Sequence, residues 1–252
     1  MNAWIRMLLM CIYLLKVSMS FGVPPLRGQK MPFAIGEKKR STSIVTKIES
    51  IPHHALIVYG GFYCSGSLIK SQIILSAASC FLKRNNQNIV VKLGANTMTE
   101  PGQVIPAIDL KLHEYFDHNT NWNNDIALLV LKVHVKFSEY TKKIQLIEPG
   151  TSLNAGIRIE VSGWSYSERR LFDNGGGAVC NDELVGVVSF GAANKKQPYV
   201  AVLTNISYYR EWIELNSQRF LKKYCHLYER NNFANAEYIV DDDAHSGTSL
   251  LY

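Results

Sequence analysis

From residue 55 the sequence reads Ala55-Leu-Ile-Val-Tyr59, Gly60-Gly61, Cys64-Ser-Gly-Ser-Leu-Ile69 and Leu75-Ser-Ala-Ala-Ser-Cys80. These are short apolar runs, and glycine or polar turn residues separate them. Further runs of this kind follow at Ile73–Leu75, Ile89–Leu93, Val104–Leu112, Ala127–Leu131, Ile157–Val161, Leu184–Phe190 and Tyr199–Leu203. Many short strands with turns between them predict an all-β barrel or sandwich. One helix is predicted, over Tyr208–Asn216.

The composition is that of a folded, globular protein. Of the 252 residues, 47% are hydrophobic and 19% are charged, a balance that can fill a core and argues against disorder. This length is compatible with one large domain or two small ones. The formal net charge of +6 lies in short scattered clusters, without the aromatic platform of a nucleic-acid binder, so no nucleic-acid partner is expected. No apolar stretch reaches the roughly eighteen residues that a membrane-spanning helix needs.

The start of the chain resembles a secretory signal peptide. Arg6 precedes the apolar run Met7–Leu15, and the small residues of Ser18-Met-Ser20 end the segment. The alternative is a buried first helix, which would have to tolerate a lysine and an abrupt change to proline. With residues 1–20 removed, the protein is expected to be secreted and extracellular. Residues 21–43 are predicted to form an irregular, activation-like leader.

The cysteine count fits an exported protein. After signal cleavage four cysteines remain: Cys64, Cys80, Cys180 and Cys225. Four thiols in such a chain suggest disulfides, with three possible pairings. None of the spacings is that of a zinc site, and the adjacent His53 and His54 would point to opposite faces of an extended strand. No metal and no other cofactor are therefore expected.

Four segments stand in a characteristic order: Cys64–Ile69; Leu75–Cys80; Asn124-Asp-Ile-Ala-Leu-Leu129 with Val161-Ser-Gly-Trp164; and Asp173-Asn-Gly-Gly176 with Leu184–Gly191. Together they resemble the trypsin-like (chymotrypsin-fold) serine proteases. The resemblance covers residues 44–216 and leaves 217–252 as a polar C-terminal tail. It implies two antiparallel β-barrels, a C-terminal helix and, in family members, peptide hydrolysis in the cleft between the barrels.

The catalytic positions of that family carry other residues here. Family members use a Ser nucleophile, a His base and an Asp that orients the imidazole. The family's Ala-Ala-His-Cys is Ala77-Ala-Ser-Cys80, which places Ser79 at the base's position. The family's Gly-Asp-Ser-Gly-Gly is Phe172-Asp-Asn-Gly-Gly176, which places Asn174 at the nucleophile's position. Only Asp125 keeps the family's residue type.

No proteolysis is expected from these residues. A neutral hydroxyl is no base near pH 7, and an amide nitrogen does not attack peptides. Phe172 stands where the resemblance implies a glycine of the oxyanion hole, so that donor is expected to be misplaced. Ser79 is instead expected to hydrogen bond to Asp125, and Asn174 to occupy a tight turn.

A deletion is the second departure from the family. Nine residues separate Trp164 from Asn174, where family members have several tens. The missing stretch would carry two strands, so the second barrel is expected to be incomplete near residues 165–172 and to expose edge N–H and C=O groups. Three explanations stay open: a partner supplies the strands, the C-terminal tail covers the edge, or the sequence lacks an exon and describes a poorly folding product.

The resemblance also implies disulfides. Cys64 and Cys80 match the bridge that lies beside the family's catalytic loop. Cys180 matches a half-cystine whose usual partner position holds Ile159. Cys180 must therefore pair with Cys225, pair with another chain, or remain free.

Two further positions are candidates for modification or activation. Asp173 matches the acid that pairs with the new N-terminus of an activated zymogen, but neither Ile44-Val45 nor the region near Arg40 offers a convincing cleavage motif. Asn205-Ile-Ser207 is an acceptor for N-glycosylation in an exported chain. The alternative for Asn205 is an ordinary residue at the end of a strand.

Three functions are compatible with the sequence. The first is an inactive serine protease homologue that binds a protease, a protease inhibitor or a peptide segment, as decoy, cofactor or regulator of proteolysis. Its peptide-binding edge would be Ser189-Phe-Gly191. The second is an active serine-type endopeptidase, and the third is a non-functional, exon-lacking variant.

Overall fold

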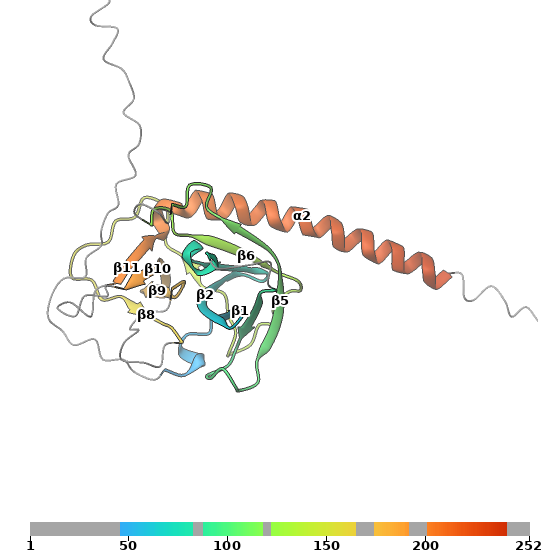
Figure 1. The fold of residues 1–252 in the computed structure, drawn as a ribbon, viewed down its shortest axis with the longest axis horizontal. Coiled ribbons are helices and arrows are strands. Elements are labelled where there is room, and N and C mark those ends of the chain that lie inside the picture. Colours follow the sequence, from blue (N-terminus) through green and yellow to red (C-terminus); the bar gives the residue numbers. More distant parts are fainter. Residues whose placement is uncertain (1–45, 83–87, 118–121, 165–173, 192–200, 241–252) are drawn as a thin grey trace, which may run out of the picture. The chain divides into compact units, whose positions relative to one another are not determined.

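The computed structural model describes residues 46–82, 88–117, 122–164, 174–191 and 201–240, all within one compact unit, Pro32–Tyr252. Six antiparallel strands close into a barrel in the order β1-β2-β3-β6-β5-β4 (Figure 1). Their bounds are β1 His54–Tyr59, β2 Phe62–Lys70, β3 Ile73–Ser76, β4 Val90–Leu93, β5 Gln103–Leu112 and β6 Ala127–Leu131. Every residue of β3 and β6 is buried, so these two strands are covered on both faces.

The second half is an open sheet. Its strands run in the order β11-β10-β9-β8, and β7 pairs in parallel with β10. Their bounds are β7 Gln145–Leu146, β8 Glu160–Val161, β9 Gly177–Cys180, β10 Glu183–Gly191 and β11 Ala201–Asn205. Among the described residues nothing joins β8 to β11. The predicted fold class, all-β with one complete and one incomplete barrel and a C-terminal helix, is confirmed.

Every predicted run overlaps a strand, but β7 and β9 were missed. β7 has only two residues and takes part in a sheet through a distant strand, which no local pattern reveals. β9 follows directly on Gly175-Gly-Gly177, a run that suggests a turn. The described chain also has two short 3-10 helices, Ile48–Ser50 and Ala78–Phe81.

The helix α2 is longer than predicted: it begins at Ile206 and ends at Val240, instead of spanning Tyr208–Asn216. It therefore includes most of the segment that was expected to be a polar tail. No Gly or Pro interrupts it, and after the predicted end its Phe220, Leu221 and Tyr224 still pack against the core. None of the helices in the described part of the chain is long and apolar enough to cross a membrane.

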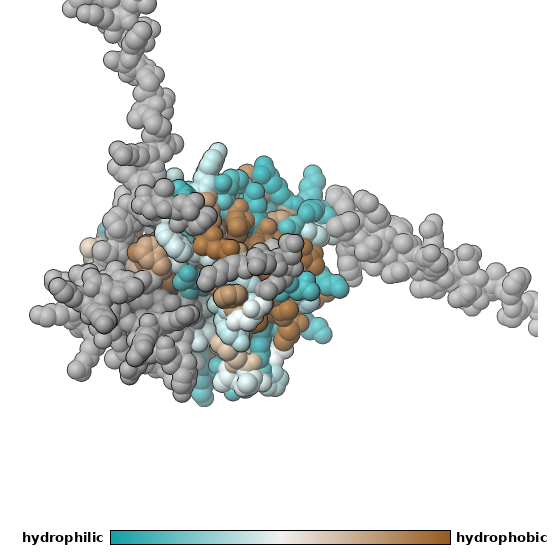
Figure 2. Space-filling model, viewed as in Figure 1, coloured by the Kyte–Doolittle hydropathy of each residue, from teal (hydrophilic) through white to brown (hydrophobic). Residues whose placement is uncertain are grey.

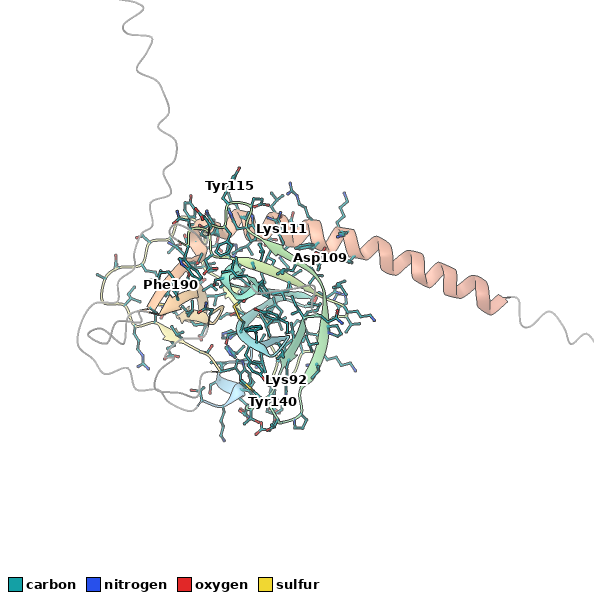
Figure 3. All side chains as sticks on the ribbon, viewed as in Figure 1. Lys92, Asp109, Lys111, Tyr115, Tyr140 and Phe190 are labelled. Carbon is teal, nitrogen blue, oxygen red and sulfur yellow. A yellow bond between two sulfur atoms is a disulfide. The ribbon has the colours of Figure 1, made fainter. Side chains whose placement is uncertain are left out.

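Polar contacts attach α2 to both halves of the fold. Lys70 of β2 pairs with Glu214 at 3.0 Å, and Asp109 of β5, which Figure 3 labels near the helix, accepts from Lys223 at 2.7 Å. Arg210 Nη1 donates to the carbonyl oxygen of Leu146 in β7 at 3.1 Å. The outer surface mixes hydrophilic and apolar residues over the described part of the face in Figure 2.

Cys64 and Cys80 form a disulfide that joins β2 to the turn carrying Ser79. We expect the double substitution Cys64→Ala/Cys80→Ala to lower the free energy of unfolding by about 3 kcal/mol, because it removes the constraint on a loop of 16 residues. Guanidinium titration measures the loss. Reductant should bring the unmodified chain to the same midpoint and leave the double variant unchanged; equal stability of the two oxidised proteins would contradict the prediction.

Candidate functional site

A buried carboxylate lies at the junction of the barrel and the second sheet. Asp125 is 1% exposed and lies two residues before the start of β6. Its Oδ1 accepts from the backbone N–H of Ser79 at 2.6 Å, and its Oδ2 accepts from the hydroxyl of Ser189 in β10 at 2.5 Å. The carbonyl oxygen of Asp125 accepts from Thr204 Oγ1 in β11 at 2.8 Å. One residue is therefore bonded to both halves of the fold.

The charge state of Asp125 reflects two opposing effects. Burial raises its pKa because the ionised carboxylate loses hydration. The hydrogen bonds from Ser189 and Ser79 oppose that rise, since they stabilise the charged form. Burial is the larger effect, so Asp125 holds its proton to a higher pH than an exposed aspartate.

Asn174 completes a polar group that we call the Asp125 cluster: Ser79, Asp125, Asn174 and Ser189. Asn174 Nδ2 donates to Ser79 Oγ at 3.3 Å, and its carbonyl oxygen accepts from the N–H of Ser65 in β2 at 3.0 Å. The next residue, Gly175, donates from its N–H to the carbonyl oxygen of Val188 in β10 at 2.8 Å. The tight turn at Asn174 is thus bonded to the barrel on one side and to the second sheet on the other.

The bulge in β10 explains how Ser189 reaches the cluster. The pairing of β10 with β11 shifts register between Val188 and Phe190, which leaves Ser189 as the extra residue. A bulge turns a side chain away from the regular alternation of a strand. Sequence reasoning assigned Ser189 only to an edge and missed its bond to Asp125, because a bulge has no clear signal in a run such as Val-Gly-Val-Val-Ser-Phe.

An aromatic pair borders this end of β10. The rings of Trp122 and Phe190 have centroids 6.0 Å apart, and Figure 3 labels Phe190 on the strand. Trp122 has φ +55°, a left-handed conformation that is unusual for a bulky residue. Two residues later Asn124 has φ +57° and bonds through its side chain to Tyr115 and Tyr209. These contacts hold the turn that presents Trp122.

In the described part of the junction, the imidazole of His54 contacts two hydroxyls, and the longer contact is that of Ser65 Oγ with its Nε2 at 3.5 Å. Ser162 Oγ lies 2.9 Å from Nδ1 of His54. Burial and, to a smaller extent, the charge of His53 together lower the pKa of His54 to about 3. An imidazole with so low a pKa is a weak proton acceptor, which makes this pair a poor nucleophile and base.

The structure brings some of the sequence-predicted site residues together, and others lie apart or outside the described residues. Ser79, Asp125 and Asn174 come together, although the bond from Ser79 to Asp125 comes from its backbone. Phe172 and Asp173 lie outside the described residues. Cys180 is buried and unbridged in the described structure, and of Cys225 only the backbone, within α2, is described. Asn205 is exposed at the end of β11. The described residues contain no group of three or more side chains that could hold a metal.

The chain is similar to known proteins of the trypsin type. A family model described as Trypsin matches residues 43–171 and 172–213. Hypodermin-B of Hypoderma lineatum is 27% identical over 221 residues, which cover 69% of this chain and 85% of that protein. Trypsin II-P29 of Gallus gallus is 27% identical over 213 residues, covering 66% of this chain and 84% of that protein.

Solved structures share the fold. A mutant of human heparin binding protein (CAP37) superposes with a TM-score of 0.59 at 22% identity, and the match covers 67% of this chain and 92% of that chain. At this identity the likeness is one of fold alone.

Proposed function

The chain belongs to the trypsin family of serine proteases, and on that premise we propose that it is a secreted homologue that binds protein segments without cleaving them. The observation that carries the proposal is the make-up of the Asp125 cluster. Around the carboxylate lie the Ser79 backbone and the Asn174 side chain, at the positions where family members have an imidazole and a nucleophilic hydroxyl.

The residues that are present do not replace the lost chemistry. Asn174 offers an amide whose nitrogen lone pair is delocalised into the carbonyl. Ser79 has a hydroxyl, but its neighbours are that amide and a carboxylate. Even with a raised pKa, Asp125 is far too weak a base to take a proton from a hydroxyl. We therefore assign Asp125 a structural role that joins the two halves of the fold.

The end of β10 is suited to an extended peptide. Phe190 and Gly191 pair with β11 on one side, while the pairing with β9 on the other side stops at Val187. In the described structure no strand pairs with that side of Ser189–Gly191. An added strand can use such free backbone groups for hydrogen bonds, and neighbouring pockets then select side chains. Trp122 and Phe190 would supply an apolar wall for that purpose.

The comparisons bear on the deletion. The two segments that the family model matches adjoin at residues 171 and 172, so part of the family pattern has no counterpart between them. The match to Hypodermin-B runs over 221 residues but takes in 69% of this chain, so several tens of its positions are gaps here. This supports a missing pair of strands in the open sheet, and it fits both a partner that completes the sheet and an exon-lacking product.

Two features of this chain support secretion: its disulfide and its apolar first residues. Disulfides such as Cys64–Cys80 persist in oxidising compartments, and the apolar start of the chain has the form of an export signal. The exposed side chain of Asn205 would then be accessible to the glycosylation machinery.

Active proteolysis remains the second candidate, because the family consists of peptidases and Asp125 retains its hydrogen-bonded setting. The two candidates differ in what Ser79 and Asn174 must do. Only the second needs one of them to move a proton or to form a covalent bond.

Peptide binding is tested with a library of fluorescently labelled octapeptides and the full secreted chain. We expect a subset of apolar peptides to bind, and Trp122→Ala and Phe190→Ala each to weaken that binding about fivefold, since an aromatic contact contributes on the order of 1 kcal/mol. Tyr140→Ala serves as the control, because Tyr140 is an exposed aromatic in the segment between β6 and β7, and Figure 3 labels it well apart from Phe190. Equal affinity of all four proteins, or no binding at all, would contradict a peptide site on β10.

A further inference from the structure

Two histidines lie where the barrel meets the second sheet. His54 begins β1 and His53 lies in the turn before it, and their exposed fractions are 3% and 7%. From the second sheet, two residues that follow β8 contact His54. Ser162 Oγ is 2.9 Å from its Nδ1, and the Trp164 ring centroid is 5.6 Å from the imidazole centroid. We call His53, His54, Ser162 and Trp164 the histidine seam.

The seam is closely packed around His53. A Cβ atom on Gly177 of β9 would lie 2.5 Å from Ser67 Oγ and 3.7 Å from His53 Nε2, so only glycine lets these strands approach. The packing leaves polar atoms uncompensated. His53 Nε2, Ser67 Oγ and Trp164 Nε1 are buried without a hydrogen-bond partner among the described residues. Each such atom costs on the order of 1–3 kcal/mol, because it gives up its hydrogen bonds to water. These costs reduce the free energy that holds the seam closed.

No charged group offsets a proton on either ring. The segments packed against the seam carry the charged residues Glu49, Lys70, Lys92, Lys142, Lys143 and Glu160. Lys70 pairs with Glu214, Glu160 pairs with Arg158, and Lys92 donates to the carbonyl oxygens of Met98 and Glu100. Each ring therefore has the other histidine as its titratable neighbour, and two imidazolium ions repel each other.

We propose that the histidine seam is an acid-operated latch: it holds the second sheet against the barrel while both imidazoles are neutral, and it opens when they are protonated. The opening brings both rings into water, where the charged form is solvated. It separates β9 and the residues after β8 from β1 and β2, and leaves the pairing within the barrel intact.

The direction follows from proton linkage. Burial lowers the pKa of His53 to about 4 and that of His54 to about 3, from 6.5 for an exposed histidine. The closed seam thus has its full stability above pH 6.5 and loses it as the pH falls towards 4. Each proton bound only by the open form shifts the equilibrium up to tenfold per pH unit, so two give up to about a hundredfold.

Asp125 is a titratable group that also bonds to both halves, and its effect has the opposite sign. Burial raises its pKa in the closed form, so acid neutralises a charge that was costly to bury. Acid opening of the seam therefore depends on the histidines.

The test is hydrogen exchange of the full secreted chain between pH 7.5 and 4.5, read by mass spectrometry and corrected for the intrinsic exchange rate. We expect exchange in peptides from β9 and the start of β2 to rise at least tenfold between pH 6.5 and 5, while β5 and β6 stay protected. The variant His53→Gln/His54→Gln should lose that rise. His134→Gln, which removes an exposed histidine bonded to Ser71, should keep it.

Two outcomes overturn the proposal: the same acid response in the double glutamine variant, or a simultaneous rise in all strands, which is global unfolding. If the double variant does not fold at pH 7.5, the imidazole resonances of the unmodified chain decide instead. Seam histidines that stay neutral down to pH 5.5 support the latch. Seam histidines that titrate near pH 6.5 in the folded protein overturn it.

Discussion

Substituting Gly175 with alanine is expected to destabilise the fold by about 3 kcal/mol or more, the largest loss of stability for a single methyl group in the described structure. Gly175 has φ +86°, where an L side chain is strained by about 1 kcal/mol or more. Its new Cβ would lie 2.1 Å from the carbonyl oxygen of Ser65 and 2.2 Å from Ser76 Oγ. The carbonyl belongs to β2 and cannot rotate aside, so the Asn174 turn would be pushed off the barrel.

Gly156→Ala is the matched control. Gly156 has φ +87° but no atom within 4 Å of the Cβ position, so its substitution carries the backbone strain without the clash. We expect Gly156→Ala to cost about 1 kcal/mol in guanidinium titrations. Equal losses at the two positions would show that Gly175 is needed only for its dihedral angles, and that the turn at Asn174 does not lie against β2 as described.

The second large effect is on catalysis. We expect the chain to hydrolyse peptides on the order of a millionfold more slowly than a complete protease of this chemistry, which is the cost of losing the serine or the histidine alone. The physical reason is that neither Ser79 nor Asn174 can accept a proton at neutral pH, so no alkoxide forms. Mass-spectrometric detection of cleaved peptides after long incubation measures the rate.

Asp125→Asn sets the background for that measurement, because it removes the carboxylate that a residual mechanism would need and keeps a side chain that can hydrogen bond to Ser79 and Ser189. The unmodified chain and this variant should release cleaved peptides at the same rate. Faster release by the unmodified chain would favour the active endopeptidase over the binding protein.

Most of the barrel could be predicted from local pattern. Runs such as Ile73–Leu75 and Ala127–Leu131 are apolar throughout and end at polar or turn residues, which is typical of fully buried strands. The four family segments placed Ser79, Asp125 and Asn174 in one site, and the structure brings them together. Those features depend on short sequence ranges.

The rest depends on long-range contacts that no local pattern contains. Beyond the predicted end at Asn216, α2 is held to the barrel by Lys223 and Tyr224, which bond to Asp109, more than a hundred residues away. His53 and His54 were expected on opposite faces of one strand, but His53 lies in a turn and both rings are buried at the junction with the second sheet. Ser189 reaches Asp125 only because β10 has a bulge, which depends on its pairing with β11. The left-handed φ of Trp122 is fixed by contacts of the folded turn and not by its residue type.

Intact-mass analysis after treatment with a fluorophosphonate probe tests the central claim most directly, since the probe forms a covalent bond only with an activated nucleophile. We predict that the full-length chain keeps its unmodified mass, as Asp125→Asn does, while trypsin treated in parallel gains the mass of the probe. A probe adduct on Ser79, or on any other side chain of the Asp125 cluster, would contradict the claim that this cleft lacks a working nucleophile.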